Sequence, residues 1–245
     1  MTKAEIQFAR SLADKRTRDS EHLFVAEGYK LVDEIRQSKL RIRTIYTTRN
    51  DVVDHNVVLV DKREMERISQ LNTASDILAV VEQPRYTLSL NELKSKLSLA
   101  LDGVQNPGNM GTIVRLADWF GIDHIICSRE CADLYNPKVV QATMGALLRV
   151  KVHYVDNLSS LLGEAKRAGM AIYGTLLDGN NIYHETLSEE GIIVMGNEGR
   201  GLSDECRKEL THKLLIPPYP ADAPTSESLN VAMATGIILS EFRRK

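Results

Sequence analysis

Three loops of the sequence gather residue types that can bind a ligand and orient a reacting group. Residues 106–115 include Gly108 and Gly111, which let the backbone approach a ligand closely, and they end in an arginine. Residues 196–201 hold Glu198 among three glycines, so its carboxylate would be displayed rather than buried. A third loop carries serine and asparagine side chains ahead of an apolar run. Their hydroxyl, amide and backbone groups can donate and accept hydrogen bonds at a ligand.

The third loop connects a predicted buried strand at 213–216 to the last predicted helix. Two prolines end the strand, because proline lacks the N–H that a sheet ladder needs. Ser226 or Ser228 is expected to cap the helix, and Ser228 and Asn230 are candidate ligand-binding side chains. A serine before an apolar run is usually only a cap, so this loop alone does not identify a site. The expected apolar stripe of the helix is Leu229, Met233 and Ile237.

Two common nucleotide-binding motifs are excluded. Gly103 and Gly108 have the spacing of a phosphate-binding loop, but Asn109 stands where that loop requires lysine. The glycines of residues 196–201 follow the reverse order of the dinucleotide motif and enclose a carboxylate. A nicotinamide-dependent oxidoreductase is therefore excluded.

The elements that would position the three loops alternate regularly after residue 98. Strands are predicted at 99–101, 125–127, 152–154, 170–175, 191–195 and 213–216, and helices at 109–120, 137–148, 158–168, 202–210 and beyond 228. This alternation predicts an α/β fold with a mostly parallel sheet covered by helices on both faces. Ligands of such sheets bind outside the carboxyl ends of the strands, where all three loops lie.

The first 84 residues predict a smaller α/β unit. Strands are predicted at 23–26, 42–48, 57–60 and 77–81, and helices at 4–17, from 29 and from 62 to 71. A polar stretch then connects to the second pattern. The predicted organisation is therefore a domain over 1–84, a linker over 85–97 and a second domain over 98–245.

Composition describes a soluble globular chain, and no apolar run approaches the roughly 20 residues that a membrane span needs. The net charge of −2 conceals a basic N-terminal third. Candidate contacts to nucleic-acid phosphates there are Arg10, Lys15, Arg16 and Arg18. A solvated helix face explains the same charges equally well.

Cysteine usage argues against a metal site and for a cytoplasmic protein. The three cysteines, Cys127, Cys131 and Cys206, cannot all pair, which fits a reducing compartment. Cys127 and Cys131 have no second cluster to complete a zinc site. No metal is expected.

The three loops together resemble, in order and approximate spacing, the motifs of the SpoU/TrmH RNA 2′-O-ribose methyltransferases of the SPOUT superfamily. The matching residues are Asn109-x-Gly111-x-x-x-Arg115, Gly196-Asn-Glu-Gly-x-Gly201, and Ile216-Pro217 followed by Ser228-Leu-Asn230. The resemblance covers about residues 97–245. Residues 24–28 and the helix after them resemble the ribosomal-protein-like substrate-binding domain that precedes the catalytic domain in many relatives.

The resemblance implies a deep C-terminal trefoil knot that forms a pocket for S-adenosylmethionine, and a homodimer in which Arg115 of one subunit completes the site of the other. It implies catalytic roles for Asn109, Arg115, Glu198, Ser228 and Asn230. It places the cofactor against Thr175, Leu176, Gly196, Asn197, Gly201, Ile216 and Leu229. One departure is the segment 218–227, which is longer than in relatives and whose course over the cofactor is not predicted.

The predicted function is therefore 2′-O-methylation of a ribose in RNA with S-adenosylmethionine as donor. Ribosomal RNA is favoured over transfer RNA because of the added N-terminal domain. A non-catalytic RNA-binding or ribosome-assembly protein is the alternative. Among the histidines, His124 and His153 are expected to be structural because they lie at strand starts, whereas His184 stays a weak alternative as a general base.

Overall fold

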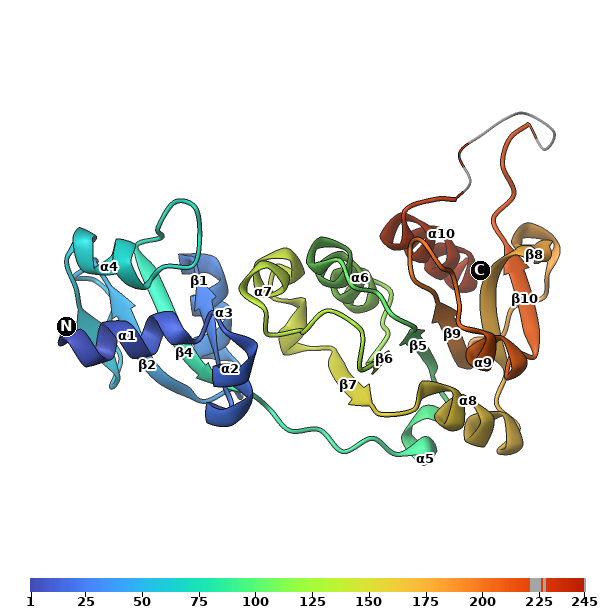
Figure 1. Cartoon of the computed structure of the whole chain (residues 1–245), viewed down its shortest axis with the longest axis horizontal. Coiled ribbons are helices and arrows are strands. Elements are labelled where there is room, and N and C mark those ends of the chain that lie inside the picture. Colours follow the sequence, from blue (N-terminus) through green and yellow to red (C-terminus); the bar gives the residue numbers. More distant parts are fainter. Residues whose placement is uncertain (221–225, 227, 245) are drawn as a thin grey trace. The chain divides into compact units, whose positions relative to one another are not determined.

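The computed structural model describes residues 1–220, 226 and 228–244. By their internal contacts these residues form two compact units, and Figure 1 labels most of their helices and strands. Unit 1 comprises Met1–Arg85 and Asp133–Leu148, and unit 2 comprises Tyr86–Ala132 and the chain from Arg149 onward. The sequence-based boundaries keep residues 133–148 with the C-terminal domain, whereas the structure places this segment in unit 1.

Unit 1 is built on a four-stranded sheet in the order β1-β4-β2-β3. Its strands are β1 (Leu23–Glu27), β2 (Ile42–Thr47), β3 (Val57–Leu59) and β4 (Ile77–Glu82), close to the predicted ranges. Its helices are α1 (Lys3–Ser11), α2 (Lys15–Glu21), α3 (Tyr29–Gln37), α4 (Lys62–Ile68), α7 (Pro137–Thr143) and the 3-10 turn η1 (Ala146–Leu148). β4 pairs antiparallel with β1 and β2, and β2 pairs parallel with β3. Apolar side chains of β1, β2 and β4 form one core with those of α1 and α4.

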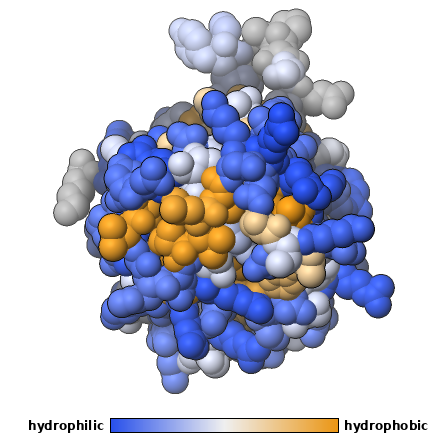
Figure 2. Space-filling view, turned by 90° about the vertical axis from the view of Figure 1, so that its left-hand side faces the viewer, coloured by the Kyte–Doolittle hydropathy of each residue, from blue (hydrophilic) through white to orange (hydrophobic). Residues whose placement is uncertain are grey.

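The surface of unit 1 is mixed in polarity. Figure 2 looks onto the side that carries the N-terminus and shows a group of hydrophobic residues surrounded by hydrophilic ones. Leu59 on the outer strand β3 and Val53 ahead of it are exposed apolar side chains of this unit. Most of the face seen in this view is hydrophilic, as a water-facing surface requires.

The single helix predicted over 4–17 is in fact two helices. The side chain of Asp14 accepts a hydrogen bond from the backbone N–H of Arg16 at 2.7 Å and caps α2. A capping residue takes an extended conformation, and Asp14 does so with ψ of 133°. The chain therefore turns between α1 and α2 instead of continuing as one helix.

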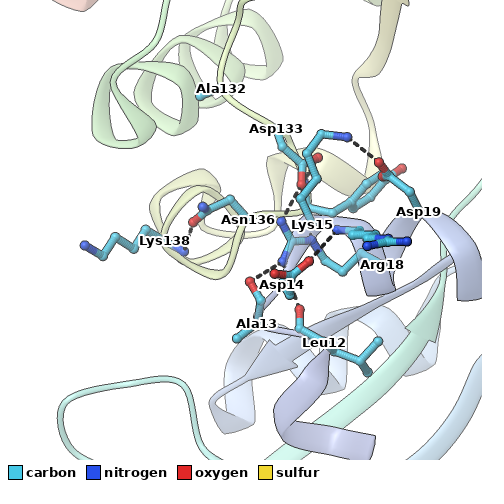
Figure 3. A network of polar contacts seen from close by, with 12 residues as sticks. Leu12, Ala13, Asp14, Lys15, Arg18, Asp19, Ala132, Asp133, Asn136 and Lys138 are labelled. Atoms are coloured by element: carbon cyan, nitrogen blue, oxygen red, sulfur yellow. Dashed lines mark hydrogen bonds and ion pairs between the residues drawn. The ribbon is translucent and has the colours of Figure 1, made fainter.

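Arg18 is a buried cation rather than the RNA contact predicted for it. Only 2% of its surface is exposed, and its guanidinium lies between Asp133 and two backbone carbonyls (Figure 3). Nη2 donates to Oδ2 of Asp133 at 2.6 Å, and Nη1 donates to the carbonyls of Leu12 and Ala13 at 2.9 and 2.7 Å. The prediction for Arg18 is therefore wrong, because all of this guanidinium's bonds hold α2 to the segment 133–148 and to the α1–α2 turn.

We expect Arg18→Ala to destabilise unit 1 by about 3–5 kcal/mol, because it leaves the Asp133 carboxylate and two carbonyls without their donor. Hydrogen exchange of the β1 and β4 amides measures this loss. Arg16→Ala is the matched control: the side chain is exposed on the same helix, and its loss should cost less than about 0.5 kcal/mol. Equal protection in the two variants would show that the buried pair does not hold the unit.

Unit 2 contains a six-stranded sheet in the order β10-β8-β9-β5-β6-β7, and each pair of neighbouring strands is parallel. Its strands are β5 (Leu97–Leu101), β6 (His124–Ser128), β7 (Lys151–Val155), β8 (Ile172–Asn181), β9 (Gly191–Met195) and β10 (His212–Leu215). Its helices are α5 (Leu90–Leu93), α6 (Pro107–Trp119), α8 (Leu158–Arg167), the 3-10 turn η2 (Ile182–His184), α9 (Asp204–Lys208) and α10 (Val231–Arg243). All residues of the central strands β5 and β9 are buried. The predicted parallel α/β fold is confirmed.

The register between β8 and β10 shifts abruptly. Gly174 pairs with Lys213, but the next pair joins Asn180 to Leu214. Residues 175–179 therefore bulge out of the ladder. A Cβ on Gly179 would lie 2.6 Å from the carbonyl carbon of Leu214, so only glycine fits where the bulge closes.

His124 and His153 form a buried pair on the adjacent strands β6 and β7. Nδ1 of His124 lies 3.2 Å from Nε2 of His153, and the rings stack with centroids 5.4 Å apart. Burial, followed by the neighbouring His124 and the charge of Lys151, lowers the pKa of His153 to about 4. The pKa of His124 is also lowered, mainly by burial. Both rings are therefore neutral and structural, as predicted.

This pair makes stability depend on pH. Unfolded His153 takes up a proton as the pH falls below about 6.5, whereas the folded residue stays neutral down to about pH 4. Stability should be full above pH 6.5 and fall by up to about 3 kcal/mol between pH 6.5 and 4. Calorimetric unfolding across this window measures the slope. His153→Gln should flatten it, whereas the exposed His55→Gln should not; equal slopes in all three proteins would contradict this assignment.

Within the described residues, no helix combines the length and the apolarity needed to cross a membrane.

Candidate active site

The first loop leads from β5 into α6, which begins earlier than predicted. The side chain of Asn106 caps the helix and accepts hydrogen bonds from the backbone N–H groups of Gly108 and Asn109 at 2.8 and 3.1 Å. Pro107 occupies the first turn, where its missing N–H costs nothing. The cap and the proline fix the start of α6, and with it the direction of the Asn109 side chain.

Asn109 connects the three predicted motifs through hydrogen bonds. Its Nδ2 donates to Oε1 of Glu198 at 2.6 Å, and its Oδ1 accepts from Nδ2 of Asn230 at 3.0 Å. The Oδ1 atom of Asn230 accepts from the backbone N–H groups of Ala232 and Met233 at the start of α10. Both ends of each amide are used, so the orientation of the Glu198 carboxylate is set by a continuous chain of bonds.

The cap of α10 is Asn230, not Ser226 or Ser228 as predicted. Asparagine caps as well as serine does, and it stands directly before the helix. The predicted apolar stripe is also wrong: Leu229 and Met233 are 49% and 64% exposed. The buried side chains of α10 are Val231, Ala232, Thr235, Ile238, Leu239 and Phe242. This helix is apolar on more than one side, so spacing alone did not show which side faces the core.

The loop after β9 is held by the side chain of Asn197. Its Nδ2 donates to the carbonyl of Gly103 at 2.7 Å, and its Oδ1 accepts from the N–H groups of Gly199 and Arg200. Asn197 and Gly201 also exchange two backbone bonds of 2.9 Å. The side chain predicted to bind cofactor is thus committed to shaping the loop that displays Glu198.

Asp102 is a supporting residue that the sequence reasoning missed. It directly follows β5, and its Oδ2 accepts hydrogen bonds from both the backbone N–H and the hydroxyl of Ser203 at 2.7 Å. Ser203 in turn caps α9. The position of an aspartate directly after a buried strand was the available signal.

A cavity of about 480 Å³ opens beside this chain of bonds. It includes all seven residues predicted to contact the cofactor: Thr175, Leu176, Gly196, Asn197, Gly201, Ile216 and Leu229. The bulge of β8 forms one wall of the cavity, and the loop after β9 forms a second. The end of β10 and the start of α10 form most of the remaining wall. Glu198 and Ser228 line it too, whereas Asn109, Asn230 and Arg115 are not among its lining residues.

The remaining candidates lie apart from this cavity. Arg115 is exposed on α6, and His184 is exposed on η2 and does not line the cavity, so the structure gives no support to His184 as a base. In unit 1, Arg10, Lys15 and Arg16 are exposed, and Lys15 pairs with Asp19 at 2.5 Å. Most of the segment 218–227 lies outside the described residues.

Metal ligands are not clustered in the described part of the chain: no group of three or more histidine, cysteine or acidic side chains could hold an ion there. The three cysteines are buried and unpaired.

Comparison with known families agrees with this geometry. The model of the SpoU rRNA Methylase family matches residues 96–240. The chain belongs to this family. The MRM3-like substrate binding domain matches residues 3–79, ahead of the SpoU region. The resemblance inferred from the three motifs, and the presence of a substrate-binding domain before the SpoU domain, are confirmed.

Several SpoU relatives span nearly the whole chain. The 23S rRNA (guanosine(2553)-2'-O)-methyltransferase of Bacillus subtilis is 28% identical over 96% of this chain and 94% of its own length. A solved TrmH-family protein from Porphyromonas gingivalis is 40% identical, with a TM-score of 0.89 over 99% of this chain and 98% of its own. An AdoMet-bound rRNA methyltransferase from Sinorhizobium meliloti is 29% identical, with a TM-score of 0.85 over 99% and 95%.

Proposed function

We propose that this protein transfers a methyl group from S-adenosylmethionine to a ribose 2′-hydroxyl of RNA. The observation that carries the proposal is the bonded chain Asn230–Asn109–Glu198 beside the cavity. It agrees with the names of two relatives, a 23S rRNA 2'-O-methyltransferase and an AdoMet-bound rRNA methyltransferase.

The cavity fits the cofactor in size and in chemistry. Its volume of about 480 Å³ lies in the range of small-molecule sites, roughly 300–1,000 Å³. Leu176, Leu214 and Ile238 supply apolar walls for an aromatic base. The backbone at Gly196 is tightly packed, since a Cβ there would collide with Gly201, so this wall presents backbone groups to a ligand.

The protein's task in this reaction is mainly positioning. S-adenosylmethionine, when bound, supplies a methyl group already activated on its sulfonium. Glu198, oriented by Asn109, is placed to accept a hydrogen bond from the ribose hydroxyl or to orient Arg115. Asn230 caps α10, and Ser228 lines the cavity beside it.

We propose that Arg115 binds the phosphate of the target nucleotide and does not act as the general base. A guanidinium stays protonated, with a pKa above about 12. Lowering that pKa to about 8 would need roughly 4 units, or about 5 kcal/mol, and a nearby phosphate would act in the opposite direction. Arginine instead suits a bidentate clamp on phosphate.

Ribosomal RNA is the favoured substrate within this proposal. The substrate-binding domain match over residues 3–79 and the ribosomal RNA named for the Bacillus subtilis relative both support it. Arg10, Lys15 and Arg16 stay candidates for RNA contacts because they are exposed on α1 and α2. A cytoplasmic location is part of the same proposal.

A trefoil knot also belongs to the proposal. Val231, Ala234 and Ile238 of α10 line the same cavity as the bulge of β8 and the loop after β9. The last helix and two earlier loops therefore enclose one cavity, as a knot around the cofactor requires.

We further propose a homodimer formed through α6 and α10. A hollow of about 450 Å³ between these helices and η2 is lined by Leu116, Tyr183, Met233, Ile237 and their neighbours. Met233 and Tyr183 are exposed although apolar in character, which favours a covered face. Arg115 lies next to Leu116 on α6 and outside its own chain's cavity, which fits a role in the partner's site.

The reaction is tested with labelled S-adenosylmethionine and RNA from cells lacking the protein. We expect label in ribosomal RNA and not in transfer RNA, at a linkage that resists alkali because its 2′-hydroxyl is blocked. Glu198→Gln and Asn109→Ala should lower turnover about 100-fold. Arg129→Gln, an exposed charge paired with Asp156, is the control and should be unaffected. Cofactor binding without methylation of any RNA would instead favour a non-catalytic RNA-binding protein.

The dimer is tested by mixing two inactive variants, Arg115→Ala and Glu198→Gln. If Arg115 acts in the partner's site, each mixed dimer has one intact site of its two. Because about half of the dimers in an equal mixture are mixed, about a quarter of wild-type activity should return. If Arg115 acts within its own chain, no site in the mixture is complete. Failure of the mixture to regain activity, with mixed dimers demonstrated by mass spectrometry, would rule out the shared site.

A further inference from the structure

A cluster of three charged side chains stands at the rim of the cavity. Nη2 of Arg207 donates to both carboxylate oxygens of Asp178 at 3.1 and 3.2 Å, and Nζ of Lys213 donates to Oδ2 of Asp178 at 3.1 Å. Asp178 and Arg207 both line the cavity. Their side chains are 54% and 38% exposed, so a ligand can reach them. The anion Asp178 and the cation Arg207 thus face the cavity, and Lys213, which is not a lining residue, adds a second cation through its bond to Asp178.

Each member of the cluster comes from an element that the structure holds firmly. Asp178 lies on the bulge of β8, which closes at Gly179 against β10. Arg207 lies on α9, whose cap is fixed by the Asp102–Ser203 bonds. Lys213 lies on β10 itself, just before the register shift. The charges are therefore arranged before any ligand arrives.

The other charged side chains of the described lining have different partners. Glu198 accepts a hydrogen bond from the neutral amide of Asn109. Arg200 lies 3.8 Å from Glu130, which is not a lining residue. Among the described lining residues, Asp178 and Arg207 are thus the anion and cation that pair with each other.

We infer that this cluster binds the α-amino-acid end of S-adenosylmethionine, with the ammonium on Asp178 and the carboxylate on Arg207 and Lys213. This inference rests on the proposed function. The methyl group must lie toward Glu198 and Asn109, and the adenine matches the apolar walls. The charged amino-acid end is the part of the cofactor that remains to be placed, and the cluster is the part of the cavity that suits it. A zwitterion with opposite charges on one carbon complements a carboxylate beside two cations.

A role in ligand binding and a purely structural role in holding the β8 bulge predict effects of different size. An exposed ion pair contributes little to stability, so neutralising it should leave the fold intact. A hydrogen bond to a charged group of a ligand, by contrast, changes the affinity by about tenfold or more.

The test compares two ligands that differ only in this end of the molecule. S-adenosylhomocysteine carries the α-amino acid, and 5′-methylthioadenosine has a methyl group in its place. Calorimetric titration of the full chain should show that Asp178→Asn and Arg207→Gln each weaken S-adenosylhomocysteine about tenfold or more. The same variants should change 5′-methylthioadenosine less than about twofold. Lys208→Gln removes an exposed charge from the same helix and should alter neither ligand.

Other outcomes overturn the inference in distinguishable ways. Equal weakening of both ligands would mean that the cluster only shapes the bulge or contacts the adenosine. Unchanged affinity for both would mean that it is a surface ion pair without a ligand. Binding of neither ligand to the wild-type chain would instead contradict the proposed function, and the inference with it.

Discussion

The amide of Asn109 is the interaction on which the site depends. It joins Glu198, 89 residues away, and Asn230, 121 residues away, in one chain of hydrogen bonds. Only the parallel sheet makes this possible, because it gathers the carboxyl ends of β5, β9 and β10 at one edge. An amide suits the position better than a charged group would, since it donates to a carboxylate and accepts from a second amide at the same time.

The cavity beside this chain owes its shape to an irregularity in the sheet. A regular β8 would continue its ladder with β10, and residues 175–178 would face that neighbour instead of a ligand. The register shift between Lys213 and Leu214 releases them. Gly179 is the residue that allows the ladder to resume, since any side chain there would strike the backbone of Leu214. This glycine therefore lets an interior strand of the sheet form a cavity wall that carries Asp178.

The parallel sheet could be predicted because strand–helix alternation is a local signal, whereas the residues that line the cavity were predicted only through the resemblance of three motifs to a known family. Sequence reasoning failed where the deciding contact is not local. Arg18 looks like one more surface cation in a basic helix, and only its partner Asp133, 115 residues away, shows that it is buried. The core face of α10 was missed for a similar reason, because apolar residues occur on several sides and the packing partner decides among them.

The same contact bears on how the substrate-binding unit forms. Residues 133–148 fall inside the stretch matched to the SpoU family, yet they complete unit 1. The ring of Tyr135 packs 4.9 Å from that of Phe24, and Nε2 of Gln141 donates to the carbonyl of Glu27 at 2.7 Å. Residues 1–84 alone would therefore expose one side of β1 and leave the cation of Arg18 buried without its carboxylate. Unit 1 is complete only when the chain has been made as far as residue 148, so the two matched regions are not independent folding units.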